Sequence, residues 1–424
     1  MGLDSGSAIE FFESVSWRGS HLGLERIGKL LSLLGNPQEK MKFVHVAGTN
    51  GKGSACSMMS SVLTCAGYRT GLNISPYINI FNERIQVDGN PISGVDLAQA
   101  ASKVKKAYSL MKDEEPTAFE LITAAALQHF HDAKCSISVM EVGLGGRLDA
   151  TNIIPNPEAA LIMPISLDHT EQLGSSLKEI ASEKAGIIKP GGAVASSPQE
   201  ESAASVLRDA CAKRGASLKF ISRQDLKIKS DTLDGLVFDY GEFKDLHIRL
   251  LGRYQPENAA VVAEAVKILR NGGWSISDDA FREGLLKTQW PARFEVVSSE
   301  PAVIIEGGHN PQCADACARN LIYYFPGKKV IFVSGIMADK DYYSVYSRIA
   351  PIASKIYVAA IDNPRAMPND ELKSHLKDMG IDASLCANVE EGIKAALSQA
   401  NKDDVICVFG SFYIAGAARK FFLG

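Results

Sequence analysis

A glycine-rich segment with a lysine and a serine is the part of this sequence best suited to bind phosphate groups. It follows a β-branched run that begins at Phe43, and small residues at 55–61 predict a helix behind it. The segment consists of Gly48, Thr49, Asn50, Gly51, Lys52, Gly53 and Ser54. A strand, a glycine-rich turn and a helix N-terminus form an anion site, because unpaired N–H groups of the first helical turn point at the ligand. The arrangement predicts that Lys52 reaches nucleotide β- and γ-phosphates and that Ser54 holds Mg²⁺.

The same segment departs from the strict phosphate-loop pattern, G-x-x-x-x-G-K-S/T. Val46 occupies the position of the first glycine, and Gly53 separates Lys52 from Ser54. A loose turn of glycines and a lysine is also compatible with an ordinary tight turn. The segment alone therefore leaves a phosphate site and a structural turn open, and the surrounding sequence has to decide between them.

Two further side chains with metal-binding chemistry follow predicted strands. Glu141 comes directly after the run 136–140, and His169 comes shortly after the run 159–165. Ligands of parallel α/β sheets bind at the carboxyl ends of the strands, so both side chains are expected at the same edge as the glycine-rich turn. A carboxylate there is a good Mg²⁺ ligand. A lone histidine is more often a surface or capping residue, but this position favours a second metal site.

The composition bounds the class of protein. The chain has 424 residues, a formal net charge of −4 and 46% hydrophobic residues, which fits an enzyme of two or three domains and gives no support to a nucleic-acid binder. Its eight cysteines contain no C-x-x-C pair, as expected for buried reduced thiols. The sequence shows neither a signal peptide nor an apolar run of the ~18 residues that a membrane span needs. We therefore expect a cytoplasmic protein with no nucleic-acid or membrane partner.

Hydrophobic periodicity predicts an α/β fold in two domains, 1–293 and 294–424. In the first, strands are predicted at 42–47, 68–74, 136–140, 159–165 and 192–196, and helices at 9–34, 95–111, 118–131, 177–188 and 200–214. Between 218 and 251 the period changes to two, which predicts a small antiparallel meander. In the second domain, strands at 302–306, 329–334, 355–361 and 404–409 alternate with helices at 311–325, 341–352, 369–379 and 389–400. This alternation is typical of a mostly parallel sheet covered on both faces.

Several short motifs, in the same order along the chain, resemble those of the folylpolyglutamate synthase/dihydrofolate synthase family, a branch of the ATP-dependent Mur ligase superfamily. The longest is E-V-G-L-G-G-R-L-D-A-T-N at 141–152. Others are L-G-L-E-R at 22–26, G-T-N-G-K-G-S at 48–54, E-K-A-G-I at 183–187, W-P-A-R-F-E at 290–295 and E-G-G-H-N-P at 306–311. The resemblance implies the Mur ligase architecture: a P-loop ATPase-type domain with a mostly parallel sheet, followed by a Rossmann-like α/β domain.

The resemblance also implies roles for individual residues. Catalysis would rest on Lys52, Lys184, His169 and Arg293. Two Mg²⁺ ions would be held by Ser54, Ser75, Glu141, His169 and Lys184, the last carbamylated so that it presents a carboxylate-like group. Beyond the glycine-rich turn, ATP would contact Asn258, Arg293, Glu306 and His309. Arg293 would be the cation that clamps the transferring phosphate. The ordinary alternative for Lys184 is a solvated lysine on a helix.

Three other segments would contact the pterin end of the acceptor. Their residues are Leu22, Gly23, Leu24, Thr117, Ala118, Phe119, Glu120, Leu148, Asp149 and Ala150. Some of them have structural alternatives. Leu22 and Leu24 also suit the apolar face of a helix, and Thr117 with Glu120 forms a T-x-x-E capping box.

Several positions depart from the motifs of the family. Tyr77 and Tyr254 stand where the family has His, Ala292 stands where it has Gly, and Gly308 replaces Ala. Glu306 stands where the family has Asp, which keeps the charge but lengthens its reach.

The resemblance implies an ATP-dependent ligase that adds L-glutamate to the γ-carboxylate of a folate, and also to dihydropteroate, through an acyl phosphate. Its partners would be the small molecules ATP, L-glutamate and the folate or dihydropteroate acceptor, and the protein would be a monomer. Two alternatives stay open: a muramyl-peptide ligase of the same superfamily, and a nucleotide-binding protein without ligase turnover. The motif at 141–152 argues against the first, and the departures leave the second open.

Overall fold

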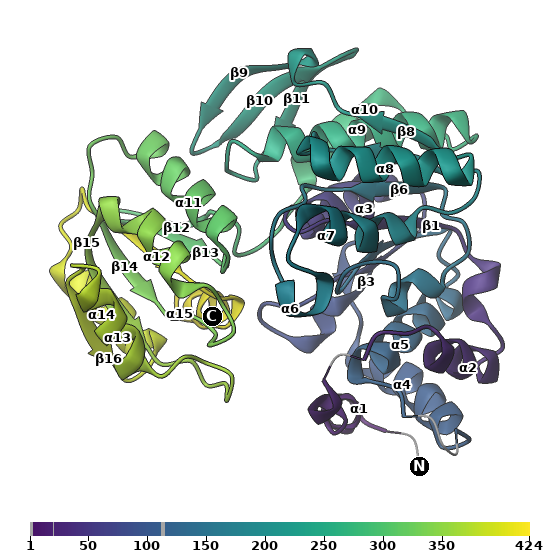
Figure 1. Cartoon of the computed structure of the whole chain (residues 1–424), viewed down its shortest axis with the longest axis horizontal. Helices are drawn as coiled ribbons and strands as arrows, with labels where there is room; N and C mark the ends of the chain where they lie inside the picture. Colours follow the sequence, from purple (N-terminus) through teal and green to yellow (C-terminus); the bar gives the residue numbers. More distant parts are fainter. Residues whose placement is uncertain (1–2, 20, 112–114) are drawn as a thin grey trace. The chain divides into compact units, whose positions relative to one another are not determined.

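The computed structural model describes residues 3–19, 21–111 and 115–424, and the chain divides into two compact units (Figure 1). Unit 1 comprises Met1–Ile228, Phe238–His247 and Pro256–Thr288. Unit 2 comprises Lys229–Val237, Ile248–Gln255 and Gln289–Gly424. The last crossing between the units follows Thr288, near the domain boundary predicted at 293/294, which stays a prediction.

Unit 1 is built on an eight-stranded sheet with the order β4-β3-β2-β5-β1-β6-β7-β8. The run from β2 to β8 is parallel, and β3 and β4 add to its edge in antiparallel fashion. The strands are β1 (Phe43–Ala47), β2 (Thr70–Asn73), β3 (Ile85–Val87), β4 (Asn90–Pro91), β5 (Ile137–Glu141), β6 (Ala159–Ile162), β7 (Ala193–Ser196) and β8 (Ser217–Phe220). Every residue of β1, β5 and β6 is buried, as expected for parallel strands covered on both faces.

Helices enclose this sheet in two apolar clusters. One packs helices α1, α2, α4 and α5 around Phe43 of β1, and the other packs α7 and α8 against β6 and β7. The helices are α1 (Ser5–Glu13), α2 (Glu25–Leu33), α3 (Lys52–Cys65), α4 (Gly94–Tyr108), α5 (Ala118–Asp132), α6 (Thr170–Leu173), α7 (Leu177–Lys184), α8 (Glu201–Arg214), α9 (Gln255–Asn271) and α10 (Asp278–Lys287). Within the described ranges, no helix is both long and apolar enough to cross a membrane.

The helix predicted at 9–34 is wrong as one element. Helix α1 ends at Glu13 and α2 begins at Glu25, and residue 20 lies outside the described residues. Gly19 and Gly23 between them have φ values of 66° and 147°. These are glycine conformations that a continuous helix cannot contain. Leu22 and Leu24 therefore precede α2 instead of lying on its apolar face.

The meander predicted from 218 to 251 is correct only in its later part. Its first strand, β8, pairs in parallel with β7 and closes the large sheet. The remaining strands, β9 (Leu226–Thr232), β10 (Gly235–Tyr240) and β11 (Phe243–Ile248), form a separate three-stranded sheet in the order β11-β10-β9. Two-residue connections between hydrogen-bonded neighbours require antiparallel pairing.

Unit 2 contains a six-stranded sheet with the order β12-β13-β17-β14-β15-β16. All pairs are parallel except β12 with β13. Its strands are β12 (Glu295–Ser299), β13 (Ala302–Glu306), β14 (Val330–Ser334), β15 (Ala353–Ala359), β16 (Ala383–Cys386) and β17 (Val405–Phe409). Its helices are α11 (Pro311–Tyr324), α12 (Tyr342–Ile349), α13 (Asn369–Asp378), α14 (Val389–Gln399) and α15 (Phe412–Leu423). The predicted Rossmann-like alternation is confirmed, although β12, β16 and α15 had no counterpart in the prediction.

The register of the large sheet aligns the strand ends that matter for chemistry. Val46 of β1 pairs with Glu141 of β5, and Ala47 pairs with Ile162 of β6. Because these strands are parallel, the segments that follow them emerge at one edge. These three strands therefore end at the same edge of the sheet, where the glycine-rich turn, Glu141 and the loop after β6 lie.

A glycine at a helix crossing offers a test of this packing. A Cβ atom on Gly284 of α10 would lie 2.4 Å from the Cα of Val62 in α3. We expect Gly284→Ala to lower the free energy of unfolding by about 1–3 kcal/mol, because the added methyl group overpacks the crossing. Denaturant unfolding would measure it. The matched control is Gly28→Ala in α2, where the nearest atom lies at 3.7 Å and a gain of about 0.5–1 kcal/mol is expected. Equal effects of the two substitutions would contradict the close crossing.

Candidate active site

The glycine-rich turn is seated against the loop that follows β6. Gly48 has a φ of 153°, and a Cβ atom there would lie 2.6 Å from the Cβ of Met163. The Thr49 N–H donates to the Pro164 carbonyl over 2.8 Å. The Thr49 hydroxyl donates to the Ser166 carbonyl over 3.0 Å and accepts the Ser166 N–H over 3.1 Å. These contacts fix the backbone of the turn before any ligand binds.

Gly51 directly precedes helix α3 and has a left-handed backbone conformation. Its φ is 82°, and Lys52 is the first helical residue. A Cβ atom on Gly51 would lie 2.7 Å from Oδ1 of Asn258 in α9. The predicted ATP contact Asn258 therefore stands beside the turn. The helix dipole of α3 adds partial positive charge at the same point.

Two lysines donate to one carbonyl oxygen of the turn. Nζ of Lys52 lies 3.1 Å and Nζ of Lys184 3.0 Å from the oxygen of Gly48, and Lys184 is buried. Burial and the Lys52 charge lower the pKa of Lys184 to about 7, against the opposing effect of Asp168 and Asp149. The structure thus brings two of the four residues predicted to be catalytic together at the turn.

Glu141 and Ser75 meet at the same edge of the sheet. Glu141 ends β5 and is buried, and the Ser75 N–H donates to its Oε2 over 2.9 Å. Burial and the negative charge of Glu141 raise the pKa of the Cys56 thiol on α3. Glu141 therefore acts on the helix that also carries Ser54, the other predicted ligand from the turn.

His169, by contrast, is half-exposed at the start of the short helix α6, where it has a φ of 51°. Its N–H donates to Oδ1 of Asp168 over 2.9 Å, and its Nε2 lies 3.9 Å from the same oxygen. In the part of the chain that the structure describes, no three side chains of His, Cys, Asp or Glu gather as a metal-binding group. The five-residue ligand set for two Mg²⁺ ions therefore stays a prediction.

A carboxylate absent from the predicted set holds the loop that carries Ser75. Glu83 accepts hydrogen bonds from the N–H groups of residues 78–80 over distances of 2.8 to 3.3 Å. Within this loop, Tyr77 packs under the guanidinium of Arg84, 5.1 Å from its ring centroid. Tyr77, one of the departures from the family motifs, thus helps to rigidify the loop.

The three segments predicted to contact the acceptor lie together. The Gly23 N–H donates to the Leu148 carbonyl over 3.3 Å, which joins the segment 22–24 to the segment 148–150. Arg26 forms an ion pair of 3.1 Å with Glu120. Glu120 and Thr117 complete the predicted capping box of α5, with bonds of 2.7 and 3.3 Å. Glu120 therefore has a structural role whether or not it also contacts a ligand.

Asp149 is engaged by its own loop. Its Oδ2 accepts the Leu144 N–H over 2.8 Å, and its Oδ1 accepts the Thr151 N–H over 3.0 Å as well as the Thr151 hydroxyl. That hydroxyl lies 2.9 Å from Nε2 of His45 in β1. Burial lowers the pKa of His45 to about 3, with a smaller contribution from the Lys189 charge. His45 is therefore neutral, and its contact with Thr151 supports the loop that contains Asp149. Nothing in the β-branched sequence around His45 signalled this role.

In unit 2, Arg293 and Glu306, two of the residues predicted to contact ATP, form an ion pair, and His309, a third, lies nearby in the sequence. Nη1 of Arg293 lies 3.3 Å from Oε1 of Glu306, and the His309 ring packs edge-on against Phe412. Burial raises the pKa of Tyr254, and the nearby charge of Glu306 raises it further. Two departures from the family motifs, at 254 and 306, thus occur at neighbouring positions.

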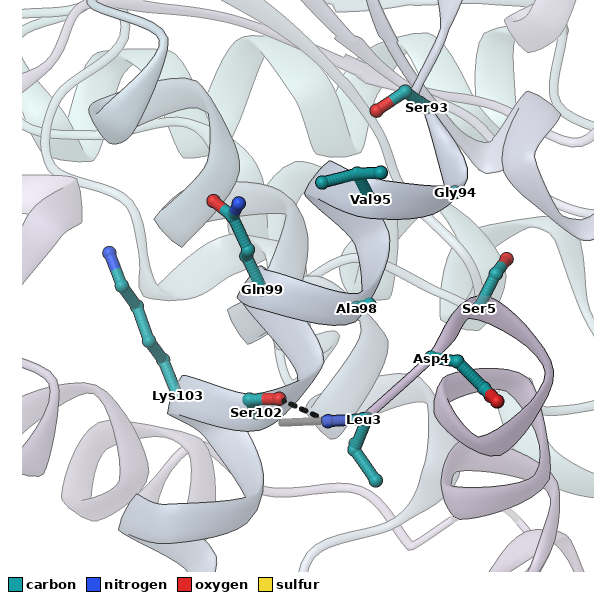
Figure 2. A pocket seen from close by; sticks show the side chains of 10 residues that line it. All are labelled: Leu3, Asp4, Ser5, Ser93, Gly94, Val95, Ala98, Gln99, Ser102 and Lys103. Atoms are coloured by element: carbon teal, nitrogen blue, oxygen red, sulfur yellow. Dashed lines mark hydrogen bonds between the residues drawn. The ribbon is translucent and has the colours of Figure 1, made fainter. Parts of the chain in front are cut away.

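A pocket lies elsewhere in unit 1. It has a volume of about 700 Å³ and lies between residues 3–5 and helix α4 (Figure 2). The Leu3 N–H donates to the Ser102 hydroxyl over 3.1 Å at its floor. No predicted site residue lines it, so we do not assign it to the reaction.

Comparison with known proteins defines the class of enzyme first. The Mur ligase middle domain matches residues 46–266, and the glutamate ligase domain of Mur ligases matches residues 292–412. This confirms the predicted Mur ligase architecture.

Individual relatives then narrow the class. The chain is 34% identical to folylpolyglutamate synthase of Lacticaseibacillus casei over 98% of this chain and 97% of the relative. It is 34% identical to dihydrofolate synthase/folylpolyglutamate synthase of Bacillus subtilis over 94% of each. The crystal structures of Mycobacterium tuberculosis folylpolyglutamate synthase with ADP and AMPPCP match with a TM-score of 0.90 and 29% identity, over 99% of both chains. The chain therefore belongs to the folylpolyglutamate synthase/dihydrofolate synthase family and is an ATP-dependent ligase.

Gly51 allows a test of the phosphate site. Gly51→Ala is expected to weaken ATP binding by about tenfold or more, because a left-handed alanine costs roughly 1–2 kcal/mol and its methyl group meets Asn258. Calorimetric titration with AMPPCP would measure it. Gly273→Ala is the control, since Gly273 has a φ of 90° with open space around it. Unchanged affinity in folded Gly51→Ala protein would contradict the assignment.

Proposed function

We propose that this chain joins L-glutamate to the γ-carboxylate of a tetrahydropteroyl-(poly)glutamate, and also to dihydropteroate, at the expense of ATP. The observation that carries the proposal is its similarity, over at least 94% of each chain, to a folylpolyglutamate synthase and to a dihydrofolate synthase/folylpolyglutamate synthase. The site supports it, because a phosphate-binding turn with two lysines lies on the same sheet edge as a buried carboxylate.

The chemistry follows from the charge of the reactants. A carboxylate is a poor electrophile, so one of its oxygens first attacks the γ-phosphorus of ATP, and the bond to the β–γ bridging oxygen breaks to release ADP. The glutamate amine then attacks the carbonyl carbon of the acyl phosphate. The tetrahedral intermediate expels phosphate, the nitrogen loses a proton, and an amide remains. Two anions must approach each other in the first step, so cations have to screen them.

The cations of this chain suit that task. Lys52 would contact the β- and γ-phosphates from the glycine-rich turn, beside Asn258. Arg293 would contact the transferred phosphate. Neutralising a developing charge in this way is worth on the order of one to three decades of rate per contact.

The buried acid of unit 1 fits a divalent cation. Glu141 holds its Oε2 against the Ser75 N–H, and a buried carboxylate near hydroxyl groups is a donor set that Mg²⁺ accepts. Ser54, Ser75 and Glu141 would hold one ion, and His169 with a carbamylated Lys184 would hold a second. The ions would supply additional charge to neutralise the phosphates.

The environment of Lys184 suits carbamylation. Only a neutral amine reacts with CO₂, and burial lowers the pKa of Lys184 to about 7. A large neutral fraction is therefore present slightly above neutral pH. The carbamate would place negative charge beside Lys52 and the turn, where this structure has two cations on one carbonyl.

The acceptor would lie along the surface formed by residues 22–24, 117–120 and 148–150, which the Gly23–Leu148 hydrogen bond and the Arg26–Glu120 ion pair hold together. We also propose that the protein acts as a cytoplasmic monomer, with an ATP-binding domain at 1–293 and a ligase domain at 294–424. Its near-neutral charge and scattered thiols support the location.

A direct assay tests the proposed function. Purified protein with Mg²⁺-ATP and L-glutamate is expected to release ADP when dihydropteroate is added, and also when tetrahydrofolate is added. Release that requires Mg²⁺ and glutamate would identify the ligase, and activity with tetrahydrofolate alone would restrict it to polyglutamylation. ATP binding without release with either acceptor, or release only with a UDP-muramoyl acceptor, would contradict the proposal.

The carbamate can be tested at Lys184. Lys184→Ala is expected to lower turnover by about tenfold or more, because a charged metal ligand is lost, and added acetate or propionate should restore part of it. Lys184→Arg is the control, since arginine stays protonated, forms no carbamate and leaves no space for a carboxylate. Wild-type turnover should also fall as the pH drops below about 7, because protonation of the amine prevents carbamylation. Full activity of Lys184→Ala would rule out this role.

A further inference from the structure

Glu306 ends β13 and turns its carboxylate back into its own unit. Its side chain is 5% exposed. Oε1 accepts the Gly308 N–H over 2.8 Å and lies 3.3 Å from Nη1 of Arg293. Oε2 accepts the Phe294 N–H over 3.1 Å. Both oxygens are therefore engaged by groups of unit 2.

Arg293 lies between this carboxylate and an aromatic ring. Its guanidinium carbon is 4.6 Å from the centroid of the Phe412 ring. The Arg293 side chain is 22% exposed, whereas the side chain of its partner acid is 5% exposed. A guanidinium has five N–H donors in one plane, and an anchor at one nitrogen fixes that plane. Glu306 therefore sets the direction in which Arg293 can meet an anion.

The backbone on either side of Arg293 needs the same support. Ala292 and Phe294 have φ values of 56° and 45°, both in the left-handed region, and both are buried. Side chains with a Cβ atom are strained in this region, so surrounding contacts must hold the turn. The Ala292 carbonyl accepts the Gly307 N–H over 2.9 Å, and Glu306 binds the Phe294 N–H. One carboxylate thus anchors both the side chain of Arg293 and the peptide that follows it.

We propose that Glu306 is a positioning residue, which fixes the Arg293 guanidinium and its turn and does not itself bind the nucleotide. The inference rests on the proposed function, in which Arg293 contacts the transferred phosphate, and it replaces the prediction that Glu306 contacts ATP. The competing role is a direct bond from the carboxylate to a ribose hydroxyl, which acidic residues form in other nucleotide sites.

The two roles differ in the kinetic constant that they change. Glu306→Gln keeps the shape but removes the charge that orients Arg293. If Glu306 positions Arg293, kcat should fall about 100-fold, while the affinity for AMPPCP and the KM for ATP change little. The fall in kcat should be the same whether ATP, 2′-deoxy-ATP or 3′-deoxy-ATP is the substrate. Arg293→Ala should cause a similar loss, and the double variant should lose little more than either single one.

The competing role predicts a different pattern. A ribose contact would raise the KM for ATP in Glu306→Gln without affecting the deoxy analogue that lacks the bound hydroxyl, and its effect would add to that of Arg293→Ala. Either result would overturn the inference. Glu306→Asp retains the charge and should recover part of kcat, which also provides a readout if the Gln variant folds poorly.

A matched control separates position from general stability. Glu264→Gln removes another buried carboxylate, which accepts the Tyr240 hydroxyl over 2.8 Å and pairs with Lys267 at 3.2 Å. It should lower the melting temperature and leave kcat unchanged. If kcat fell equally in both variants, the effect of Glu306 would be explained by protein stability alone. This result would contradict a positioning role. A wild-type enzyme that releases no ADP would instead refute the proposed function, so the two failures are distinguishable.

Discussion

Two lysine ammonium groups share one backbone carbonyl, and much of unit 1 is arranged around that contact. The Gly48 oxygen receives Lys52 from α3 and Lys184 from the end of α7. Burial first, and then the nearby charge of Lys52, lower the pKa of Lys184 to about 7. The turn consequently carries positive charge that its backbone carbonyl groups do not neutralise. In the proposed function, a bound phosphate group would relieve the repulsion between the two lysines.

The aligned strand ends make this concentration of charge possible. Mostly apolar runs identified β1, β5 and β6 from the sequence, because a strand covered on both faces is apolar at most of its positions. The rule that ligands of parallel sheets bind at the carboxyl ends of the strands then singled out Glu141 as a candidate metal ligand. Local patterns failed where a distant partner decides the structure. Residues 217–220 join the large sheet because β7 offers an edge, and Gly19 and Gly23 interrupt an otherwise helical periodicity.

The supporting residues of the site were harder to predict than the groups that they support. His45 acts through Thr151, which lies 106 positions away in the sequence, and its neighbours in β1 are ordinary strand residues. Glu83 holds the Ser75 loop through backbone N–H groups, a contact with no sequence pattern of its own. The motifs of the family marked Arg293 and Glu306 but not their mutual contact. That pairing depends on the side-chain length at 306 and on the turn at 292–294.

The fit around Gly308 also constrains the order in which this region can change during evolution. A Cβ atom on Gly308 would lie 2.7 Å from the Cβ of Cys313 and 3.2 Å from Oε1 of Glu306. The glutamate at 306 and the absence of a methyl group at 308 therefore depend on each other. An alanine introduced at 308 would be disfavoured while glutamate remains at 306, and easier to accept once a shorter acid has retracted the carboxylate. Because the Cβ of Cys313 is the nearer neighbour, the fit of an alanine at 308 depends on the residues at both 306 and 313, and changes at these three positions are expected to be coupled.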